Sequence, residues 1–327
     1  MNKLKMLSIG VTVCDTDFHL LYSLLEQIEE RVLIPHEVII IDNREEFLNE
    51  PVKWKSDFTF GYNATQFSAR SEIIELAKGD YIWFIDGDDE IDYVDSFDYT
   101  EDIITFSYST YKIGDVHIDS QIITDDIFTF QTGCLIHPVL WNKFIKKDLF
   151  KTKFPETKII TNEDTLWLYS AMKNARSLRI VDKVIYHHKL GLSNKEIGVT
   201  FDNVKTLVTG YDEMRELLKD LVDEDFYRLS IEATNAHVMS FIPRCNEVEK
   251  ATEYFLDLIP KDEFRTSLIK TVFPKSRTQS AYKKIFDTVS KRYGEQYCYP
   301  TVTCKVTYDD CRVEDYTFIQ TIEFVNN

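Results

Sequence analysis

The sequence is poor in residues that interrupt regular structure, since its 327 positions include only 10 glycines and 8 prolines. This composition excludes a collagenous or low-complexity chain. The hydrophobic content of 44% is enough to build packed cores. No apolar run approaches the roughly 18 residues that a membrane-spanning helix needs, and Asp15 and Asp17 interrupt the short apolar run near the start. We therefore expect a soluble, folded protein with neither a signal peptide nor a transmembrane helix.

Cysteines are few, and cations are outnumbered by anions. The six cysteines show no paired spacing, which fits reduced thiols in the cytoplasm better than a disulfide framework. The 38 Lys and Arg residues against 55 Asp and Glu give a net charge of -17, which disfavours diffuse binding to nucleic acid or to an anionic membrane. The exception lies between Lys261 and Arg292, where nine residues are basic and three acidic. It indicates either an anion-facing surface or ordinary solvated helices, and the sequence leaves both open.

Strand and helix patterns alternate in the first part of the chain. Residues 7–13, 38–41 and 81–85 are short, strongly apolar runs of the kind found in buried parallel strands. Helical spacing follows the first run over residues 20–28, and residues 65–78 form a second helix that should end at Gly79. These patterns predict an α/β fold with a mostly parallel sheet flanked by helices. In such sheets, ligands bind beyond the carboxyl ends of the strands.

The later part of the chain has a different pattern. Residues 200–292 are mainly helical in spacing, and residues 301–308 and 313–325 alternate like the two strands of a terminal β-hairpin. We therefore divide the chain into a catalytic or ligand-binding domain at residues 1–195 and an accessory region at 196–327. The accessory region would serve acceptor binding or oligomerisation, and the sequence does not choose between them.

An acidic turn, Asp86-Gly87-Asp88, follows the third apolar run. Carboxylates two residues apart at a strand end can point to the same side, and the glycine allows a tight turn between them. Hard oxygen ligands of this kind suit Mg²⁺ or Mn²⁺, which keep open positions for phosphate oxygens. A solvated acidic turn explains the same residues equally well.

Four segments, residues 8–15, 37–43, 78–89 and 141–150, together resemble glycosyltransferase family 2, whose nucleotide-binding fold is called GT-A. The resemblance covers roughly residues 5 to 195, and the segment around the acidic turn is the most specific. It implies a nucleotide-sugar donor, with UDP-sugars favoured, and a Mn²⁺ or Mg²⁺ cofactor. It implies nucleotide contacts from Thr12, Asp42, Arg70 and Asp86, and metal contacts from Asp88, Asp86 and His188. Further candidates for the site are Asp89, His187, Asp15, Trp141 and Lys143.

An acidic pair, Glu163-Asp164, opens a predicted helix. Physical chemistry alone interprets these acids as first-turn residues that complement the helix dipole. The resemblance implies instead that Asp164 is the general base that deprotonates the acceptor hydroxyl, with Glu163 beside it binding the acceptor. A single in-line displacement would then invert the anomeric centre.

The sequence departs from the family at several positions, with Cys14, Asn43 and Ser71 replacing an aromatic residue, an aspartate and an asparagine. It also lacks the late Gln-x-x-Arg-Trp motif of processive synthases, which favours a single-addition enzyme. We expect a metal-dependent inverting glycosyltransferase acting on a hydroxyl acceptor. A phosphate-rich acceptor, such as wall teichoic acid, a capsule precursor or a modified base in viral DNA, would suit the basic segment, and nucleic acid would enter only in that role. The competing hypothesis is a protein that binds a nucleotide or glycan without chemistry.

Overall fold

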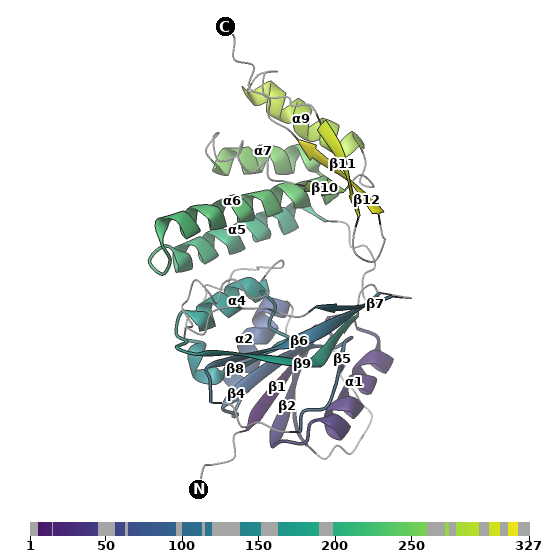
Figure 1. The fold of residues 1–327 in the computed structure, drawn as a ribbon, viewed down its shortest axis with the longest axis vertical. Helices are drawn as coiled ribbons and strands as arrows, with labels where there is room; N and C mark the ends of the chain where they lie inside the picture. The colour runs from purple at the N-terminus through teal and green to yellow at the C-terminus, as the bar shows by residue number, and fades with distance from the viewer. Residues whose placement is uncertain are drawn as a thin grey trace. The chain divides into compact units, whose positions relative to one another are not determined.

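The computed structural model describes residues 6–14, 16–44, 56–62, 65–95, 100–112, 115–119, 138–151, 163–189, 199–259, 272–274, 279–293, 301–307 and 313–319. The chain divides into two compact units, Met1–Glu196 and Ile197–Asn327. Each unit has its own helices and its own sheet (Figure 1). Of the helices in the described ranges, none is both long enough and apolar enough to cross a membrane.

The first unit is an α/β unit, as the alternating patterns predicted. Its strands are β1 (Leu7–Val13), β2 (His36–Asp42), β3 (Asp57–Tyr62), β4 (Tyr81–Asp86), β5 (Glu90–Ile91), β6 (Ile103–Lys112), β7 (Asp115–Asp119), β8 (Lys143–Lys146) and β9 (Leu178–Lys189). Its helices are α1 (Phe18–Arg31), α2 (Gln66–Leu76), α4 (Glu163–Met172) and the short 3-10 helix η1 (Lys147–Leu149).

One mixed sheet contains all of these strands, in the order β3-β2-β1-β4-β8-β6-β9-β5, with β7 paired to β6. The first four strands in this order are parallel to one another. Strand β8 runs antiparallel to both of its neighbours, and β6 and β9 are parallel. The parallel block therefore brings the carboxyl ends of β1, β2 and β4 to one edge, which is where ligands of such sheets bind.

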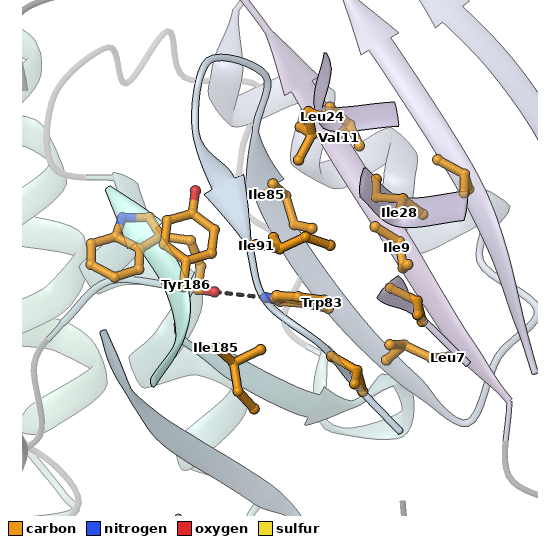
Figure 2. Close-up of a cluster of buried hydrophobic side chains, with 14 of the residues drawn as sticks. Leu7, Ile9, Val11, Leu24, Ile28, Trp83, Ile85, Ile91, Ile185 and Tyr186 are labelled. Carbon is orange, nitrogen blue, oxygen red and sulfur yellow. Dashed lines mark hydrogen bonds between the residues drawn. The ribbon is translucent and has the colours of Figure 1, made fainter. Parts of the chain in front are cut away.

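The two faces of the sheet are covered because side chains along β1 alternate. Leu7, Ile9 and Val11 point toward α1, whose Leu24 and Ile28 are fully buried against them (Figure 2). On the opposite face, a Cβ placed on Gly10 would lie 2.4 Å from Cγ2 of Ile73 in α2. Alternation between an apolar residue and a glycine thus lets one strand pack a helix on each face.

Helix α2 ends earlier than its sequence suggests. It begins after Thr65, whose side chain accepts a hydrogen bond from the Ser68 backbone N–H, and it ends at Leu76 with Ala77 as its C-cap in an extended conformation. Gly79 is therefore not the cap that we predicted. Its backbone N–H donates to Ser8 Oγ at 2.8 Å, so the glycine is needed where the chain passes close to β1.

Replacing Gly79 with alanine should destabilise the first unit by about 1–3 kcal/mol, since overpacking forces backbone to move. A Cβ at this position would lie 2.7 Å from the Ser8 backbone nitrogen and 2.8 Å from the Met6 carbonyl oxygen. Urea unfolding measures the loss. Lys78→Ala is the control, because that side chain is 73% exposed and its removal should change stability by no more than about 0.5 kcal/mol. Equal effects would contradict the close approach.

Strand β9 contains more residues than the stretch of β6 beside it. Ile103 pairs with Leu178 at one end, Tyr108 pairs with Tyr186 further on, and the register shifts on both sides of Ser107. Between these two pairs, β9 therefore has three more residues than β6. Bulges of this kind leave residues unpaired and change which side chains face which side of the sheet.

The second unit contains helices and a small sheet, as predicted for this part of the chain. Its helices are α5 (Phe201–Leu218), α6 (Glu224–Phe241), the 3-10 helix η2 (Ile242–Arg244), α7 (Val248–Leu258) and α9 (Gln279–Tyr293). Strands β11 (Thr301–Thr307) and β12 (Val313–Ile319) form the expected antiparallel hairpin, and β10 (Val272–Pro274), which we did not predict, pairs with β12. Helices α5 and α6 lie side by side (Figure 1).

Candidate active site

Strand register brings the predicted site residues of the first unit together. Thr12 of β1 is aligned with Asp86 of β4, and the next residue, Val13, is aligned with Asp42 of β2. These residues therefore lie at the carboxyl edge of the parallel block. Thr12, Asp42 and Asp86 come from three separate segments, but they share one edge of the sheet because parallel strands end on the same side.

Asp86 is held in place by three side chains. Its Oδ1 accepts hydrogen bonds from Thr12 Oγ1 and from Gln66 Nε2, each at 3.0 Å, and lies 3.6 Å from the Arg70 guanidinium. Burial raises the pKa of the Asp86 carboxyl, and the attraction of Arg70 opposes this shift. The orientation of the carboxylate is thus fixed by β1 and α2 as well as by its own strand.

Arg70 is a buried cation, only 1% exposed, surrounded by acids. Its guanidinium contacts Asp164, Glu163 at 3.0 Å and Asp86 at 3.6 Å. Burial disfavours the charged guanidinium, but the three carboxylates outweigh burial and raise the pKa of Arg70. The structure therefore connects the acidic turn after β4 to the first turn of α4 through one side chain of α2.

The acidic pair stands in the first turn of α4, as both interpretations of the sequence required. Glu163 is buried, and burial raises the pKa of its carboxyl against the pull of Arg70. Asp164 is more accessible, with 18% of its side chain exposed, and its Oδ2 also accepts from the Leu140 backbone N–H at 3.3 Å. Asp164 is therefore the more solvent-accessible of the two carboxylates.

Tyr186 ties strand β9 to the acidic turn. Its hydroxyl donates to Asp89 Oδ2 at 2.5 Å and accepts from the Asp86 backbone N–H at 3.2 Å. Burial, together with the Asp89 charge, raises the pKa of the Tyr186 hydroxyl well above its ordinary value. The phenol stays neutral and keeps the turn closed.

The two adjacent histidines of β9 face opposite ways, as strand geometry predicts. His188 lies on the side of the acidic turn, with Nδ1 at 3.1 Å from Asp89 Oδ2, whereas His187 Nδ1 lies 2.6 Å from Ser109 Oγ on β6. Burial disfavours the His188 imidazolium, but Asp89 outweighs burial and raises the pKa of His188. Burial lowers the pKa of His187.

The Trp141 ring packs against both Tyr186 and His188. Its ring stacks on Tyr186 with centroids 4.7 Å apart and on His188 with centroids 5.3 Å apart. Its backbone carbonyl accepts from Trp83 Nε1 at 2.7 Å, and Figure 2 shows Trp83 beside Tyr186 in the core. Trp141 therefore supports the ring positions of two residues that contact Asp89.

Lys143, the first residue of β8, is fully buried. Its Nζ donates to the Val139 carbonyl oxygen at 2.7 Å and to Asn142 Oδ1 at 2.6 Å. Burial lowers the pKa of Lys143 to about 7, and the charge of Asp164 opposes this shift. Burial thus favours the neutral amine form of Lys143.

This lowered pKa predicts a pH-dependent stability. Because the folded-state pKa lies below the unfolded value, the unfolded chain binds more protons between about pH 7 and pH 10.5. The unfolding free energy of the native protein should therefore rise with pH in that window, by at most about 1.4 kcal/mol per pH unit. We expect Lys143→Met to lack this rise when urea unfolding is measured from pH 6.5 to 9.5. Parallel pH curves for the two proteins would contradict the assignment.

Asp42 is committed to an ion pair. Its Oδ2 lies 2.6 Å from Arg44 Nη2, and Oδ1 accepts from the Arg44 backbone N–H at 2.9 Å. Thr12, as described, binds Asp86. Asp15, a further predicted site residue, lies outside the described residues.

The acidic turn offers oxygen donors of the kind that a divalent cation binds. Asp86 and Asp88 offer hard oxygen donors at the strand end, whereas the Asp89 carboxylate is occupied by Tyr186, His188 and the Lys189 backbone N–H. Within the described ranges, no group of three or more His, Cys, Asp or Glu side chains is arranged to hold a metal ion. This donor set suits Mg²⁺ or Mn²⁺, which are usually bound by one or two carboxylates, water and substrate phosphates.

Sequence reasoning assigned no role to three residues that shape the site. Gln66 fixes Asp86, Tyr186 fixes Asp89, and Arg44 neutralises Asp42. Gln66 and Arg44 are ordinary polar residues in helix and turn positions, and Tyr186 fits any buried strand. Only their three-dimensional contacts distinguish them.

Comparisons with known proteins find similarity in structure but not in sequence. No protein-family model matches the chain, and no curated protein sequence matches it. Solved structures of Staphylococcus aureus TarS residues 1–349 match over 98% of this chain. The structure without ligand covers 98% of its own chain at TM-score 0.60 and 16% identity, and the complex with UDP-GlcNAc covers 98% at TM-score 0.62 and 16% identity. The complex with UDP covers 97% at TM-score 0.60 and 17% identity.

The fold is GT-A-like. The similarity extends through both units of the chain, since it spans 98% of the residues. The predicted α/β sheet flanked by helices, with a helical region and hairpin after it, is confirmed as a fold class.

Proposed function

We propose that the chain is a glycosyltransferase that takes a sugar from a nucleotide-sugar donor and transfers it to a hydroxyl acceptor. The observation that carries this proposal is the Arg70 cluster, which holds Asp86, Glu163 and Asp164 together at the carboxyl edge of a GT-A-like sheet. The TarS chain that shares this fold was solved in complex with UDP-GlcNAc. A UDP-sugar is therefore the first donor to test.

The residues divide into three roles in this proposal. Thr12 and Asp42 mark the nucleotide edge, where the base or ribose would lie against β1 and β2. Asp164 accepts the proton of the acceptor hydroxyl as its oxygen attacks the anomeric carbon, and the partial exposure of Asp164 lets it meet the acceptor. Arg70 holds Asp164 and Glu163 in position through the contacts of its guanidinium. A single displacement by this route inverts the anomeric centre.

A divalent cation would be held by Asp88 and Asp86, together with the donor phosphates. Mg²⁺ or Mn²⁺ bound there would neutralise the charge that grows on the departing diphosphate. Tyr186 and His188 hold Asp89 and so keep the acidic turn in one conformation. In this proposal, sugar transfer depends on the metal ion, as the resemblance to glycosyltransferase family 2 implies.

The acceptor proposal depends on the basic segment between Lys261 and Arg292. In the described part of that segment, Lys284 pairs with Glu249 at 3.1 Å and Arg292 pairs with Asp257 at 2.6 Å. Exposed pairs of this kind contribute about 0–1 kcal/mol, so an incoming phosphate can displace them. We propose a phosphate-rich acceptor, and its binding should weaken steeply as salt rises. Acceptor binding insensitive to salt would contradict this.

The deciding experiment is a thermal-shift screen of UDP-, GDP-, CDP- and TDP-sugars with Mn²⁺ or Mg²⁺, followed by assays of transfer and donor hydrolysis. A donor at a hundred times its Kd stabilises the folded protein by about 2.7 kcal/mol. We expect one nucleotide class to raise Tm only with metal, and Asp88→Ala to abolish that metal dependence. Asp95→Ala is the matched control, since its side chain is 62% exposed on a nearby loop. Donor binding without transfer or hydrolysis would favour a binding protein, and no donor binding would reject both.

A further inference from the structure

The ion pair between Asp42 and Arg44 buries its anion and exposes its cation. The Asp42 side chain is 3% exposed, whereas the Arg44 side chain is 24% exposed. Asp42 is the last residue of β2, and Arg44 follows two residues later, so both lie at the edge of the sheet where ligands of such folds bind. A molecule that arrives at this edge therefore meets the guanidinium of Arg44 and has little access to the carboxylate of Asp42.

Both carboxylate oxygens of Asp42 already accept hydrogen bonds. Oδ1 accepts from the Arg44 backbone N–H and from Arg44 Nε, each at 2.9 Å, and Oδ2 accepts from Arg44 Nη2 at 2.6 Å. Two-pronged contacts between arginine and a carboxylate are stronger and more directional than neutral hydrogen bonds. A nucleotide can therefore use Asp42 as a hydrogen-bond acceptor only by displacing Arg44.

Two further contacts fix the plane of the Arg44 guanidinium. Its Nη1 donates to the Thr16 carbonyl oxygen at 2.9 Å, in the turn between β1 and α1. Its central carbon lies 4.3 Å from the centroid of the Phe18 ring, at the start of α1, and Phe18 is 40% exposed. Arg44 is thus oriented by β2, by a turn and by α1 before any ligand binds, which reduces the entropy that ligand binding costs.

The position of Arg44 indicates which part of a nucleotide it would meet. The strand order β2-β1-β4 places the end of β2 two strand spacings, or about 10 Å, from Asp86 at the end of β4. In the proposed function the diphosphate lies at the β4 end, and the nucleoside extends from it across β1, so its base arrives at the end of β2. A base has a flat face that stacks on a guanidinium and, in most nucleotides, carbonyl oxygens that accept hydrogen bonds.

We propose that Arg44 recognises the base of the nucleotide donor and that Asp42 acts as a positioning residue for Arg44. The ligand is a nucleoside diphosphate whose base carries a carbonyl oxygen, as in UDP. This inference rests on the proposed function and deepens it, because it assigns base recognition to a residue that the resemblance to family 2 does not include. The buried carboxylate of Asp42 then acts through the guanidinium rather than on the nucleotide itself.

The test is isothermal titration of the full chain with UDP and with pyrophosphate, each in the presence of Mn²⁺. Arg44→Met should weaken UDP binding by about tenfold or more, the scale of a lost base-stacking contact, and should leave pyrophosphate binding unchanged. Arg44→Lys should lose nearly as much, because an ammonium keeps the charge but not the planar group. Arg179→Met, at a side chain that is 51% exposed, is the control for loss of a cation and should bind UDP as the native protein does.

A double-variant cycle tests whether Asp42 acts through Arg44. Asp42→Asn removes the oxygen that accepts from Arg44 Nη2, so it should weaken UDP binding by itself. Combined with Arg44→Met, it should have no further effect, because the residue through which it acts is already absent. An equal loss in both backgrounds would show that Asp42 contacts the nucleotide directly.

Three other results would overturn the inference alone. Tighter UDP binding by Arg44→Met would show that Arg44 obstructs Asp42, unchanged binding would show that the base lies elsewhere, and equal losses for UDP and pyrophosphate would show that Arg44 contacts phosphate. Absence of UDP and pyrophosphate binding by the native protein would instead overturn the inference together with the proposed UDP-sugar donor. Thermal unfolding of each variant separates a lost contact from a lost fold.

Discussion

Replacing Arg70 with methionine should destabilise the protein by about 3–5 kcal/mol, the usual effect of removing one partner from a buried ion pair. Methionine fills much of the same volume, but Glu163, Asp164 and Asp86 would then face one another without a cation. Chemical denaturation at pH 8 measures the loss. Arg70→Lys should recover only part of it, because an ammonium cannot reproduce the planar guanidinium contacts with several carboxylates.

Two controls separate this effect from general loss of charge. Arg179→Met removes a side chain that is 51% exposed and 3.4 Å from Glu101, and it should cost no more than about 1 kcal/mol. Burial already raises the pKa of Glu163 and of Asp86, so lowering the pH protonates these acids and removes their repulsion. The penalty of Arg70→Met should therefore shrink between pH 8 and pH 5. A penalty as small as that of Arg179→Met would contradict the central role of the Arg70 cluster.

Asp164→Asn should reduce sugar transfer by about 10²–10⁴-fold, the contribution of a positioned general base, while leaving donor affinity unchanged. Asparagine has nearly the same shape and can still accept hydrogen bonds through Oδ1 from Arg70 or Leu140, so the helix start should be preserved. Single-turnover transfer and donor titration, measured with the donor identified by the screen, distinguish chemistry from binding.

The control for Asp164→Asn is Asp148→Asn, an equally conservative change at an exposed position in η1. That variant should transfer at the native rate. Undiminished transfer by Asp164→Asn would remove Asp164 from the chemistry, whereas loss of donor binding would show that it holds the donor. Thermal unfolding of both variants establishes that the fold is intact.

The apolar runs at residues 7–13, 38–41 and 81–85 were enough to predict three of the four strands of the parallel block, whereas β3 was not predicted. Residues 7–13 and 81–85 are short apolar runs of the length expected for buried strands, and the observed strands start at the same residues. The end of α2 could not be predicted, because Gly79 is required by a contact with β1 rather than by the helix. Strands β6 and β8 also escaped prediction, since antiparallel pairing of β8 with β4 and β6 depends on residues distant in sequence.

For the site, the sequence singled out carboxylates that the structure brings together, but not the side chain that holds them. Asp86, Glu163 and Asp164 stood out because acids cluster at strand and helix ends. Their common partner, Arg70, lies 93 positions before Glu163, and one sequence contains no sign of that distance being bridged. The roles of these residues in transfer stay predictions.

Strand β9 has three more residues than β6 between their paired ends. These residues determine which face of the sheet each later side chain of β9 points to. Because side chains alternate from one face to the other, an odd insertion exchanges the two faces. His188 is thereby turned toward Asp89 and His187 toward Ser109. Deleting one residue from the bulge would restore the opposite phase and present His187 to the acidic turn. The same deletion would turn Tyr186 away from Asp89, so the length of this one strand decides which side chains reach the turn.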